Sequence, residues 1–238
     1  NVFRGCSKLT NFVLPDSVTT FEGHPFTNCQ SLVFFTVSAD NPNFTAVQSE
    51  QGNYNVLYTK SSPKTIALFP TGIQTAFAVA QDVEAIAPHA FNSSRITRLT
   101  FAPSETQISI GDYAFAQCNY LTEVVISPRV KQIGNFAFYN NAILRQIALQ
   151  PDTDNENALT IGDYAFSAVP AAEITIPERV SLIGVGAFEK CYSLTNIVFE
   201  QASEIELPLN IEGHAFAECS ALAQIELPAR LAYLGDYA

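Results

Sequence analysis

The feature that most constrains this chain is a six-residue phrase that returns at nearly regular intervals. Ile-Gly-Asp-Tyr-Ala-Phe ends at Phe115 and Phe166, and close variants end at Phe138 and Phe188. With weaker copies, the anchor phenylalanines are Phe3, Phe26, Phe91, Phe115, Phe138, Phe166, Phe188 and Phe216. Successive anchors are 23, 65, 24, 23, 28, 22 and 28 residues apart, and the longest interval is close to three periods. Such a period over the whole chain is typical of a solenoid and excludes a globule with a closed core.

Each period also carries a short apolar unit of the form Leu-x-x-Ile-x-Leu, as at 121–126 and 144–149. Its last two apolar positions are two residues apart, so we expect a strand whose apolar side chains point inward while their neighbours face solvent. A proline often follows, as at Pro128, Pro177 and Pro228. Proline ends the strand because it has no N–H to donate. The Gly and Ala-Phe that come next predict a tight turn and a short helical or 3₁₀ return.

One rung buries a single apolar row and cannot be stable alone, so the rungs must stack and pair their strands into a parallel sheet. Residues 38–79 depart from the pattern: 63–68 and 74–79 resemble degenerate rungs, and the polar stretch 41–58 is compatible with a hairpin. Both ends of the chain fall inside a repeat, and there is no Met, so we expect a processed or excised piece of a longer array. We predict one domain over residues 1–238. It is an α/β repeat solenoid of about ten rungs, with a parallel sheet on one face and short helical or 3₁₀ turns on the other.

The repeat resembles that of the BspA-like leucine-rich repeat family, whose phrase is roughly Leu-x-x-Ile-x-Leu-Pro-x-x-Val-x-x-Ile-Gly-x-x-Ala-Phe-x-x-Cys. Residues 222–228 and 161–166 match the two halves of this phrase almost letter for letter. The turn glycine is missing at Glu22 and Glu212, which leaves the local loop geometry open. The resemblance implies a right-handed leucine-rich-repeat superhelix from a bacterial or protist surface protein, and an extracellular or cell-surface location.

The charge balance argues against two classes of partner. Twelve basic and 23 acidic side chains give a formal net charge of −11, which disfavours binding to nucleic acid or to an anionic membrane surface. No apolar run approaches the roughly 18–20 residues of a membrane span, so we expect no membrane insertion.

The cysteines and histidines occupy repeat slots and do not converge on a site. Each cysteine lies three residues after an anchor phenylalanine, at Cys6, Cys29, Cys118, Cys191 and Cys219. We interpret them as buried free thiols that act as small hydrophobic residues. The histidines lie two residues before an anchor, at His24, His89 and His214, and we interpret them as packing or surface residues. No spacing typical of a zinc site, a catalytic triad or a phosphate loop occurs, so we expect no metal, no cofactor and no enzymatic activity.

Two acidic loops and two glycosylation sequons leave alternatives open. The long loops near 150–158 and 200–206 would form an acidic ridge for a cation or a basic partner if they lie on the same edge, whereas a solvated loop is the simpler interpretation. Asn43-Phe-Thr45 and Asn92-Ser-Ser94 are sequons that matter only in a eukaryotic source. Ser94 occupies the buried-thiol slot, which makes the second sequon less accessible.

The outward residues of the predicted strands are the candidate binding surface. They are mixed, small and polar, with Phe34 as the one exposed aromatic residue, and they offer no aromatic ladder for stacking on sugars. The predicted partner-contacting residues are Phe34, Arg98, Glu123, Gln146, Glu173, Asn196 and Gln224. A broad face of this kind suits a protein partner, with a few residues carrying most of the binding energy.

The family resemblance implies a non-catalytic adhesion or recognition module whose partner is an extracellular matrix protein or a host receptor. The alternative is a structural spacer, part of a larger surface protein, with no ligand of its own. Binding to a panel of matrix proteins separates the two hypotheses, because a spacer should bind none of them.

Overall fold

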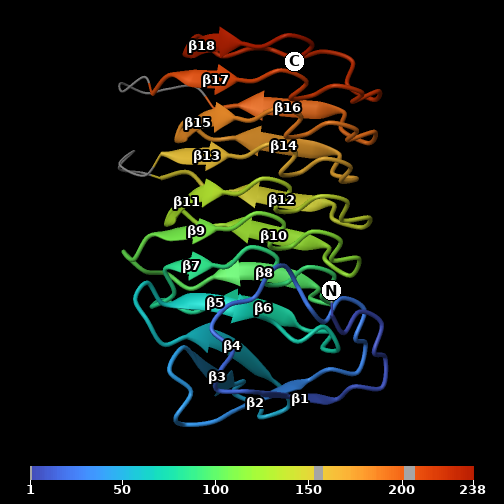
Figure 1. Ribbon diagram of the computed structural model, residues 1–238. Helices are drawn as coiled ribbons and strands as arrows, with labels where there is room; N and C mark the ends of the chain where they lie inside the picture. Colours follow the sequence, from blue (N-terminus) through green and yellow to red (C-terminus); the bar gives the residue numbers. More distant parts are fainter. Residues whose placement is uncertain (1, 153–157, 201–206) are drawn as a thin grey trace.

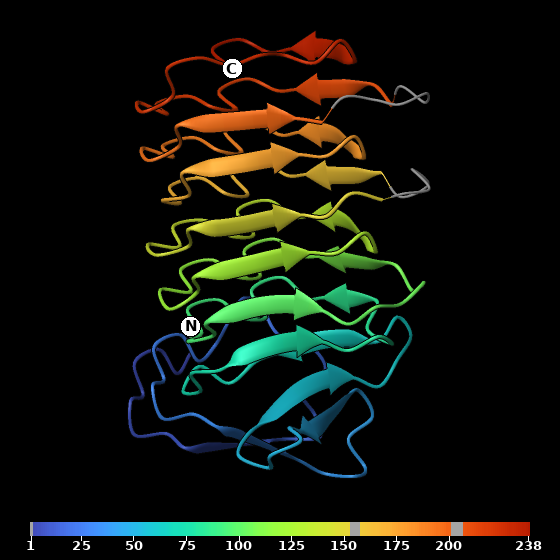
Figure 2. The same ribbon diagram turned by 180° about the vertical axis from the view of Figure 1, so that it is seen from behind.

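The structure is a computed structural model that describes residues 2–152, 158–200 and 207–238. Figures 1 and 2 show a stack of coils in which most coils contribute one strand to each of two faces. The first face holds β6 (Ala76–Val79), β8 (Arg98–Phe101), β10 (Glu123–Ile126), β12 (Gln146–Leu149), β14 (Glu173–Ile176) and β16 (Asn196–Phe199). These are the strands that the Leu-x-x-Ile-x-Leu unit predicts, and those that pair do so in parallel. The prediction of a parallel solenoid is confirmed.

A second sheet covers the opposite face, where we had predicted none. It holds β5 (Thr65–Leu68), β7 (Ala85–Ile86), β9 (Ile108–Ile110), β11 (Val130–Ile133), β13 (Leu159–Ile161), β15 (Val180–Ile183), β17 (Leu209–Ile211) and β18 (Leu231–Leu234). Most of these strands follow the Pro of a repeat, although no Pro lies between β6 and β7. They pair in parallel from β5 to β18. Their first and last residues are mostly buried, as Val130 and Ile133 are in β11. The Val-x-x-Ile half of the repeat therefore also forms strands.

The predicted helical or 3₁₀ return is wrong, because the described residues contain no helix at all. Instead, the segment around each anchor phenylalanine is a run of turns. In the rung of Phe115, Tyr113 and Gln117 have φ values of 55° and 57°, and a residue in this left-handed region stops a helix from propagating. The N–H groups of Tyr113, Phe115 and Gln117 donate to carbonyls of the next rung at 2.7–2.9 Å. The turns are thus hydrogen-bonded between rungs, much as the strands are.

The anchor phenylalanines stack into one column behind the turns. Consecutive rings of Phe69, Phe91, Phe115, Phe138, Phe166, Phe188 and Phe216 have centroids 4.7–5.4 Å apart. All seven are buried, which confirms the alignment that a 23-residue period requires. Phe69 lies 22 residues before Phe91 and so supplies one of the anchors that the long interval in the sequence lacks.

The first residues of the chain form a smaller stack that joins the main one through antiparallel strands. β1 (Asn11–Leu14) and β2 (Phe34–Val37) pair in parallel, and β3 (Phe44–Gln48), β4 (Asn55–Thr59) and β5 pair antiparallel within the irregular stretch 38–79. The side chain of Asn55 accepts a hydrogen bond from the N–H of Phe35 and donates to its carbonyl, at 2.7 and 2.9 Å. This small stack has its own apolar cluster, with Leu14, Phe26 and Leu32 inside it.

Buried His24 fastens the small stack to the main one. Its Nδ1 accepts a hydrogen bond from the N–H of Phe26 at 3.2 Å, so its Nε2 is the donor to the carbonyl oxygen of Phe69, also at 3.2 Å. The hydroxyl of Thr71 donates to the carbonyls of Phe26 and Cys29 at 3.1 and 2.9 Å. Together, the two hydrogen bonds of the His24 ring require a neutral imidazole that carries its proton on Nε2.

Acidification is expected to weaken this junction. Burial lowers the pKa of His24 from 6.5 to about 4, and the nearby His89 adds to this effect. Below pH 6.5 the unfolded chain therefore takes up a proton that the folded chain binds only near pH 4, so the stability falls as the pH falls through this window. Between about pH 7 and about pH 4.5 the expected loss is about 2 kcal/mol.

Urea unfolding at these two pH values measures the effect of His24. The variant His24→Gln keeps a donor for the carbonyl of Phe69 but has no titratable group in this range. Between these two pH values the unfolding free energy of the variant should therefore fall by about 2 kcal/mol less than that of the wild type. Equal pH dependence in the two proteins would show that His24 does not couple protonation to folding.

Candidate functional site

The first face presents a row of outward side chains at successive rungs. Arg98 pairs in register with Glu123, Glu123 with Gln146, and Glu173 with Asn196. The inward neighbours Leu99, Val124, Ile147, Ile174 and Ile197 are all buried. The structure therefore places five of the seven residues selected from the sequence on one face, which is turned toward the viewer in Figure 2.

The other two selected residues lie elsewhere. Phe34 is half-buried on β2, where it pairs with Asn11 in the two-stranded sheet of the small stack. Gln224 is exposed in a segment that is not a strand, although the repeat predicts one at 222–227. Ile225 and Leu227 of that segment are 38% and 42% exposed. They lack the packing that holds the inward residues of the other rungs, which accounts for the missing strand.

Arg98 and Glu123 bind each other across two strands. Arg98 Nε lies 2.8 Å from Glu123 Oε2, and Nη2 donates to Oε1 at 2.9 Å. The Arg98 side chain is 51% exposed and that of Glu123 28%. An ion pair this accessible to water adds little to stability. Its consequence is electrostatic, since it neutralises one end of the row and leaves Arg145 and Glu173 as the charges nearer the centre.

A shallow hollow of about 490 Å³ interrupts the first face between β12 and β14. β12 bonds to β10 and β14 bonds to β16, but β12 and β14 belong to different hydrogen-bonded sheets although they pack side by side. The hollow is lined by Arg145, Gln146 and Glu123 on one side and by Glu173 on the other. Glu123 is already paired with Arg98. The cause is visible in the sequence, because Ala171 stands where the adjacent rungs carry a leucine. The smaller inward side chain of Ala171 gives β14 less packing against its neighbour than a leucine would.

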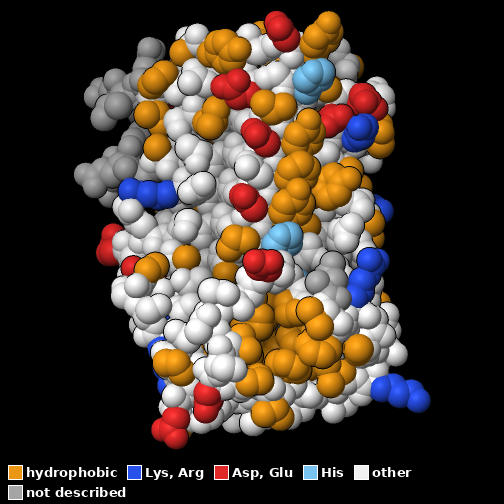
Figure 3. All heavy atoms as spheres, viewed as in Figure 1, with side chains coloured by type: hydrophobic (Ala, Val, Ile, Leu, Met, Phe, Trp, Pro, Cys, Tyr) orange, Lys and Arg blue, Asp and Glu red, His pale blue; other side chains and the backbone are white. Residues whose placement is uncertain are grey.

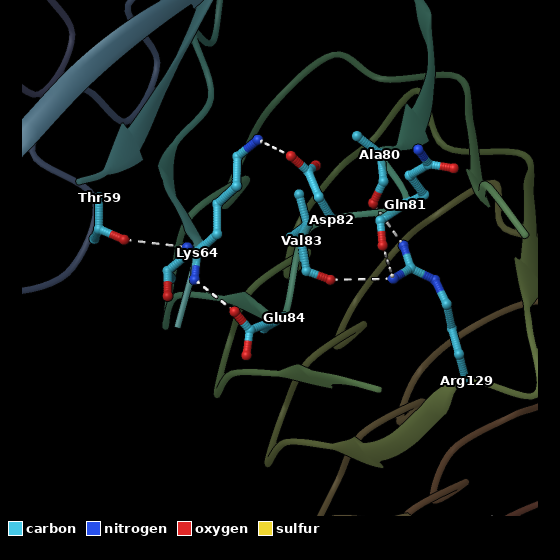
Figure 4. Close-up of polar contacts among 9 residues, drawn as sticks. Thr59, Lys64, Ala80, Gln81, Asp82, Val83, Glu84 and Arg129 are labelled. Carbon is cyan, nitrogen blue, oxygen red and sulfur yellow. Dashed lines mark hydrogen bonds and ion pairs between the residues drawn. The ribbon is translucent and has the colours of Figure 1, made fainter. Parts of the chain in front are cut away.

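Three buried arginines, which the repeat pattern did not single out, hold neighbouring rungs together. Arg129, Arg179 and Arg230 are 4%, 1% and 5% exposed, and each donates to main-chain carbonyls of earlier rungs. Figure 4 shows Arg129 reaching the carbonyls of Ala80 and Val83, at 2.8 and 3.1 Å. In the same view Lys64 pairs with Asp82 on the adjacent loop. The signal was an arginine placed just before the Val or Leu that opens a strand of the second face.

The turns carry an aromatic row, formed by residues that all occupy the same slot of the repeat. The rings of His89, Tyr113, Phe136 and Tyr164 stack with centroids 4.7–4.9 Å apart and planes within 13° of parallel. Figure 3 shows an orange column running along the stack between two pale-blue histidines. Because the rings cover one another's faces, only their edges meet solvent. The row therefore stabilises the rungs and offers no flat platform to a sugar ring.

The outcomes for the cysteines differ by position. Cys29, Cys118, Cys191 and Cys219 are buried and free, as predicted, whereas Cys6 is free but exposed. Cys6 belongs to the outermost rung of the small stack, so no earlier rung among the described residues covers it. Cys118 Sγ lies 3.3 Å from the hydroxyl of buried Ser94, which confirms that Ser94 occupies the thiol slot. Burial raises the pKa of the Cys118 thiol to about 12.

The histidines pack as predicted. His24 is buried, whereas His89 and His214 stack on Tyr113 and Tyr237. Within the described ranges no group of three or more His, Cys, Asp or Glu side chains is placed to hold a metal ion. The acidic loops proposed as a ridge lie, except for their flanks, outside the residues that the structure describes. In the part of the chain that is described, no helix has the length and apolar content needed to cross a bilayer.

Comparison with known proteins identifies the repeat. Six copies of the family model described as "BspA type Leucine rich repeat region" match residues 1–50, 84–206 and 201–238. No curated protein is similar enough to match this chain.

Three solved structures share the fold at low sequence identity. A leucine-rich repeat protein from Eubacterium ventriosum is 21% identical, with a TM-score of 0.62, over 93% of this chain and 56% of its own. The pneumococcal vaccine antigen PcpA is 20% identical, with a TM-score of 0.60, over 86% and 50%. A leucine-rich repeat protein from T. pallidum is 19% identical, with a TM-score of 0.54, over 96% and 86%. The chain thus spans about half the length of the first two.

Proposed function

Because the chain belongs to the BspA type leucine rich repeat family, we propose that it is a non-catalytic recognition module of a cell-surface or extracellular protein. In this proposal it acts as one leucine-rich-repeat domain and binds a protein partner through the outward face of β6 to β16. A relative in structure is described as a vaccine antigen, a description that fits a protein exposed to the outside of a cell. That relative supports the location without identifying a partner.

The observation that carries the proposal is the hollow at the break between β12 and β14. It lies within the exposed row, and Gln146 and Glu173, both selected from the sequence, line it. A solenoid that only spaced other domains apart would need no recess at this place on its face. Arg145 and Glu173 present opposite charges to the hollow, and a partner that pairs with both would gain specificity more than affinity. The amide of Gln146 can both donate and accept a hydrogen bond.

The partner-binding experiment uses a panel of immobilised extracellular matrix proteins. The wild-type chain is expected to bind at least one member, and the double variant Gln146→Arg, Asn196→Arg should weaken that binding by at least about tenfold, as the loss of central contacts does. The control is Gln132→Arg, Asn210→Arg, which adds the same charge at exposed positions of the second sheet. It should change affinity by less than about twofold.

The two remaining outcomes reject the proposal in different ways. If the wild type binds no member of the panel, the chain is better described as a spacer. If the two double variants weaken binding equally, the partner does not recognise the first face, and charge alone explains the loss.

A further inference from the structure

A polar crevice lies between the small stack and the turns of the main stack. In Figure 1 the N-terminal residues lie beside the turns near the level of β8. The larger part of the crevice has a volume of about 740 Å³, and a second hollow of about 420 Å³ adjoins it through Arg4, Thr27 and Gln117, which line both. A volume of several hundred cubic ångströms is typical of small-molecule sites. The first face, which carries the proposed protein site, contributes no residue to this crevice.

The charge of the larger hollow differs from that of the whole chain. The chain carries a net charge of −11, yet the lining includes Arg4 and Arg95 and no Asp or Glu. The adjoining hollow has one carboxylate, Glu22, together with His24 and His89. An acidic protein that places two arginines and no acid around one recess favours an anionic group there. Arginine suits a carboxylate, because its planar fork donates two parallel hydrogen bonds to the two carboxylate oxygens.

Arg95 is held at the wall with an incomplete set of partners. Its guanidinium lies 4.8 Å from the centre of the Tyr120 ring, and Nη2 donates to Gln74 Oε1 at 3.2 Å. Its Nε is buried and makes no hydrogen bond to any described residue. A buried donor without an acceptor is unfavourable. A carboxylate that drew the guanidinium toward the crevice would supply that acceptor while the Tyr120 ring kept its plane oriented.

The rest of the lining indicates what carries the carboxylate. Nine of the twelve lining residues are Asn, Gln, Ser or Thr, and none is aliphatic. Gln30, Gln117, Asn119 and Asn140 each offer an amide that can donate and accept, which suits neighbouring hydroxyl groups. An acidic peptide would bring side chains that seek apolar pockets, and these are missing from the lining. We propose that this crevice binds an oligosaccharide of two or three sugars that bears a carboxylate, with Arg4 and Arg95 as its anion partners.

The test titrates the whole chain with trigalacturonic acid by calorimetry and compares a sulfated trisaccharide and neutral maltotriose. Trigalacturonic acid should bind, maltotriose should bind at least about tenfold more weakly, and added salt should lower the affinity for the acid. Arg4→Gln, at an exposed residue, and Arg95→Gln should each weaken binding by about tenfold. Lys131→Gln, which removes the same charge from the second sheet, should leave it unchanged.

Several results would overturn the assignment. One is that trigalacturonic acid does not bind measurably, and another is that it binds no more tightly than maltotriose. A third is that neither Arg4→Gln nor Arg95→Gln changes the affinity for the acid. Tighter binding of the sulfated trisaccharide would replace the carboxylate with a sulfate as the recognised group. The urea midpoint of each variant shows whether it is folded, and Arg4→Gln keeps the test valid if Arg95→Gln is not. Matrix-protein binding at the first face is measured separately, so failure here leaves that proposal standing.

Discussion

Replacing Arg179 with Met is expected to lower the free energy of unfolding by about 3–5 kcal/mol, an unusually large effect for a residue outside the apolar column. Arg179 is 1% exposed. Its Nε donates to the carbonyl of Gln150 at 2.7 Å, Nη1 to that of Val130 at 2.9 Å and Nη2 to that of Ser127 at 3.1 Å. These acceptors belong to two earlier rungs, so one side chain holds three rungs together.

Met fills a similar volume but leaves those carbonyls without their donors, and buried groups that lose a partner are unfavourable. Burial lowers the pKa of Arg179 to about 10, while Asp152 opposes the shift. The guanidinium therefore remains charged at neutral pH, and the three donors stay in place. Because the next buried arginines lie about 50 residues away on either side, none of them can substitute for it.

Urea unfolding followed by circular dichroism measures the loss, with Arg145→Met as the control. Arg145 is exposed on the first face, so its replacement should change stability by less than about 0.5 kcal/mol. Arg179→Lys restores the charge but not the planar fork, and its stability should lie between those of the wild type and the Met variant. A loss below about 1 kcal/mol for Arg179→Met would show that water replaces the lost donors.

Of the other two buried arginines, Arg230 should matter less than Arg179. The Nε groups of Arg129 and Arg230 are buried without a hydrogen bond to any described residue, whereas Arg179 Nε has its carbonyl. Arg230 donates to three carbonyls, those of Pro177, Val180 and Leu207, so its replacement removes fewer hydrogen bonds than that of Arg179 and also removes an unpaired buried donor. Arg129 donates to five carbonyls, so its replacement should not be milder than that of Arg179. A larger loss of unfolding free energy at Arg179 than at Arg230 would show that the specific hydrogen bonds matter, and not only the burial of an arginine.

The column and the inward strand residues were predictable because a period near 23 constrains both. An anchor such as Phe138 must stack on Phe115 if identical rungs follow one another, and the i, i+2 pair of each strand must face the core. The second sheet was not predictable in the same way, because its strands are short and a Pro, which has no N–H to donate, stands before most of them. The turns were not predictable because Ala-Phe favours a helix, whereas the positive φ at residues such as Tyr113 and Gln117 is not a preference of those residue types.

Some of the candidate binding residues were predictable from the repeat and others were not. The row from Arg98 to Asn196 follows from strand alternation and needed no tertiary information. The crevice of Arg4 and Arg95 depends on contacts between parts of the chain that the repeat does not relate, whereas the break beside Gln146 coincides with Ala171, a local departure from the repeat. Phe34 shows this limit most clearly: its slot is equivalent to that of Arg98 in the repeat, but the antiparallel connection through β3 and β4 places it on a different sheet.

Replacing Gly134 with Ala is expected to lower the free energy of unfolding by about 3 kcal/mol or more, although only one methyl group is added. An ideal Cβ at Gly134 would lie 2.6 Å from the main-chain carbon of Gly111 and 2.7 Å from the main-chain nitrogen of Asp112. Both atoms are backbone of the adjacent rung, so no side chain can move aside. The rungs would have to separate, and the hydrogen bond from the N–H of Asn135 to Asp112 Oδ1, now 2.7 Å long, would stretch.

The control Gly5→Ala separates crowding from backbone strain. Gly5 has a φ of +77° and no heavy atom within 4 Å of the added methyl, whereas the φ of Gly134 lies outside the left-handed region. Ala at residue 5 should therefore lose only about 1 kcal/mol, from its backbone conformation. The loss at Gly134 should be several times larger and should come from contact alone. Equal losses in urea unfolding would mean that the rungs can move apart freely, which is incompatible with a column of rings stacked less than 5.5 Å apart.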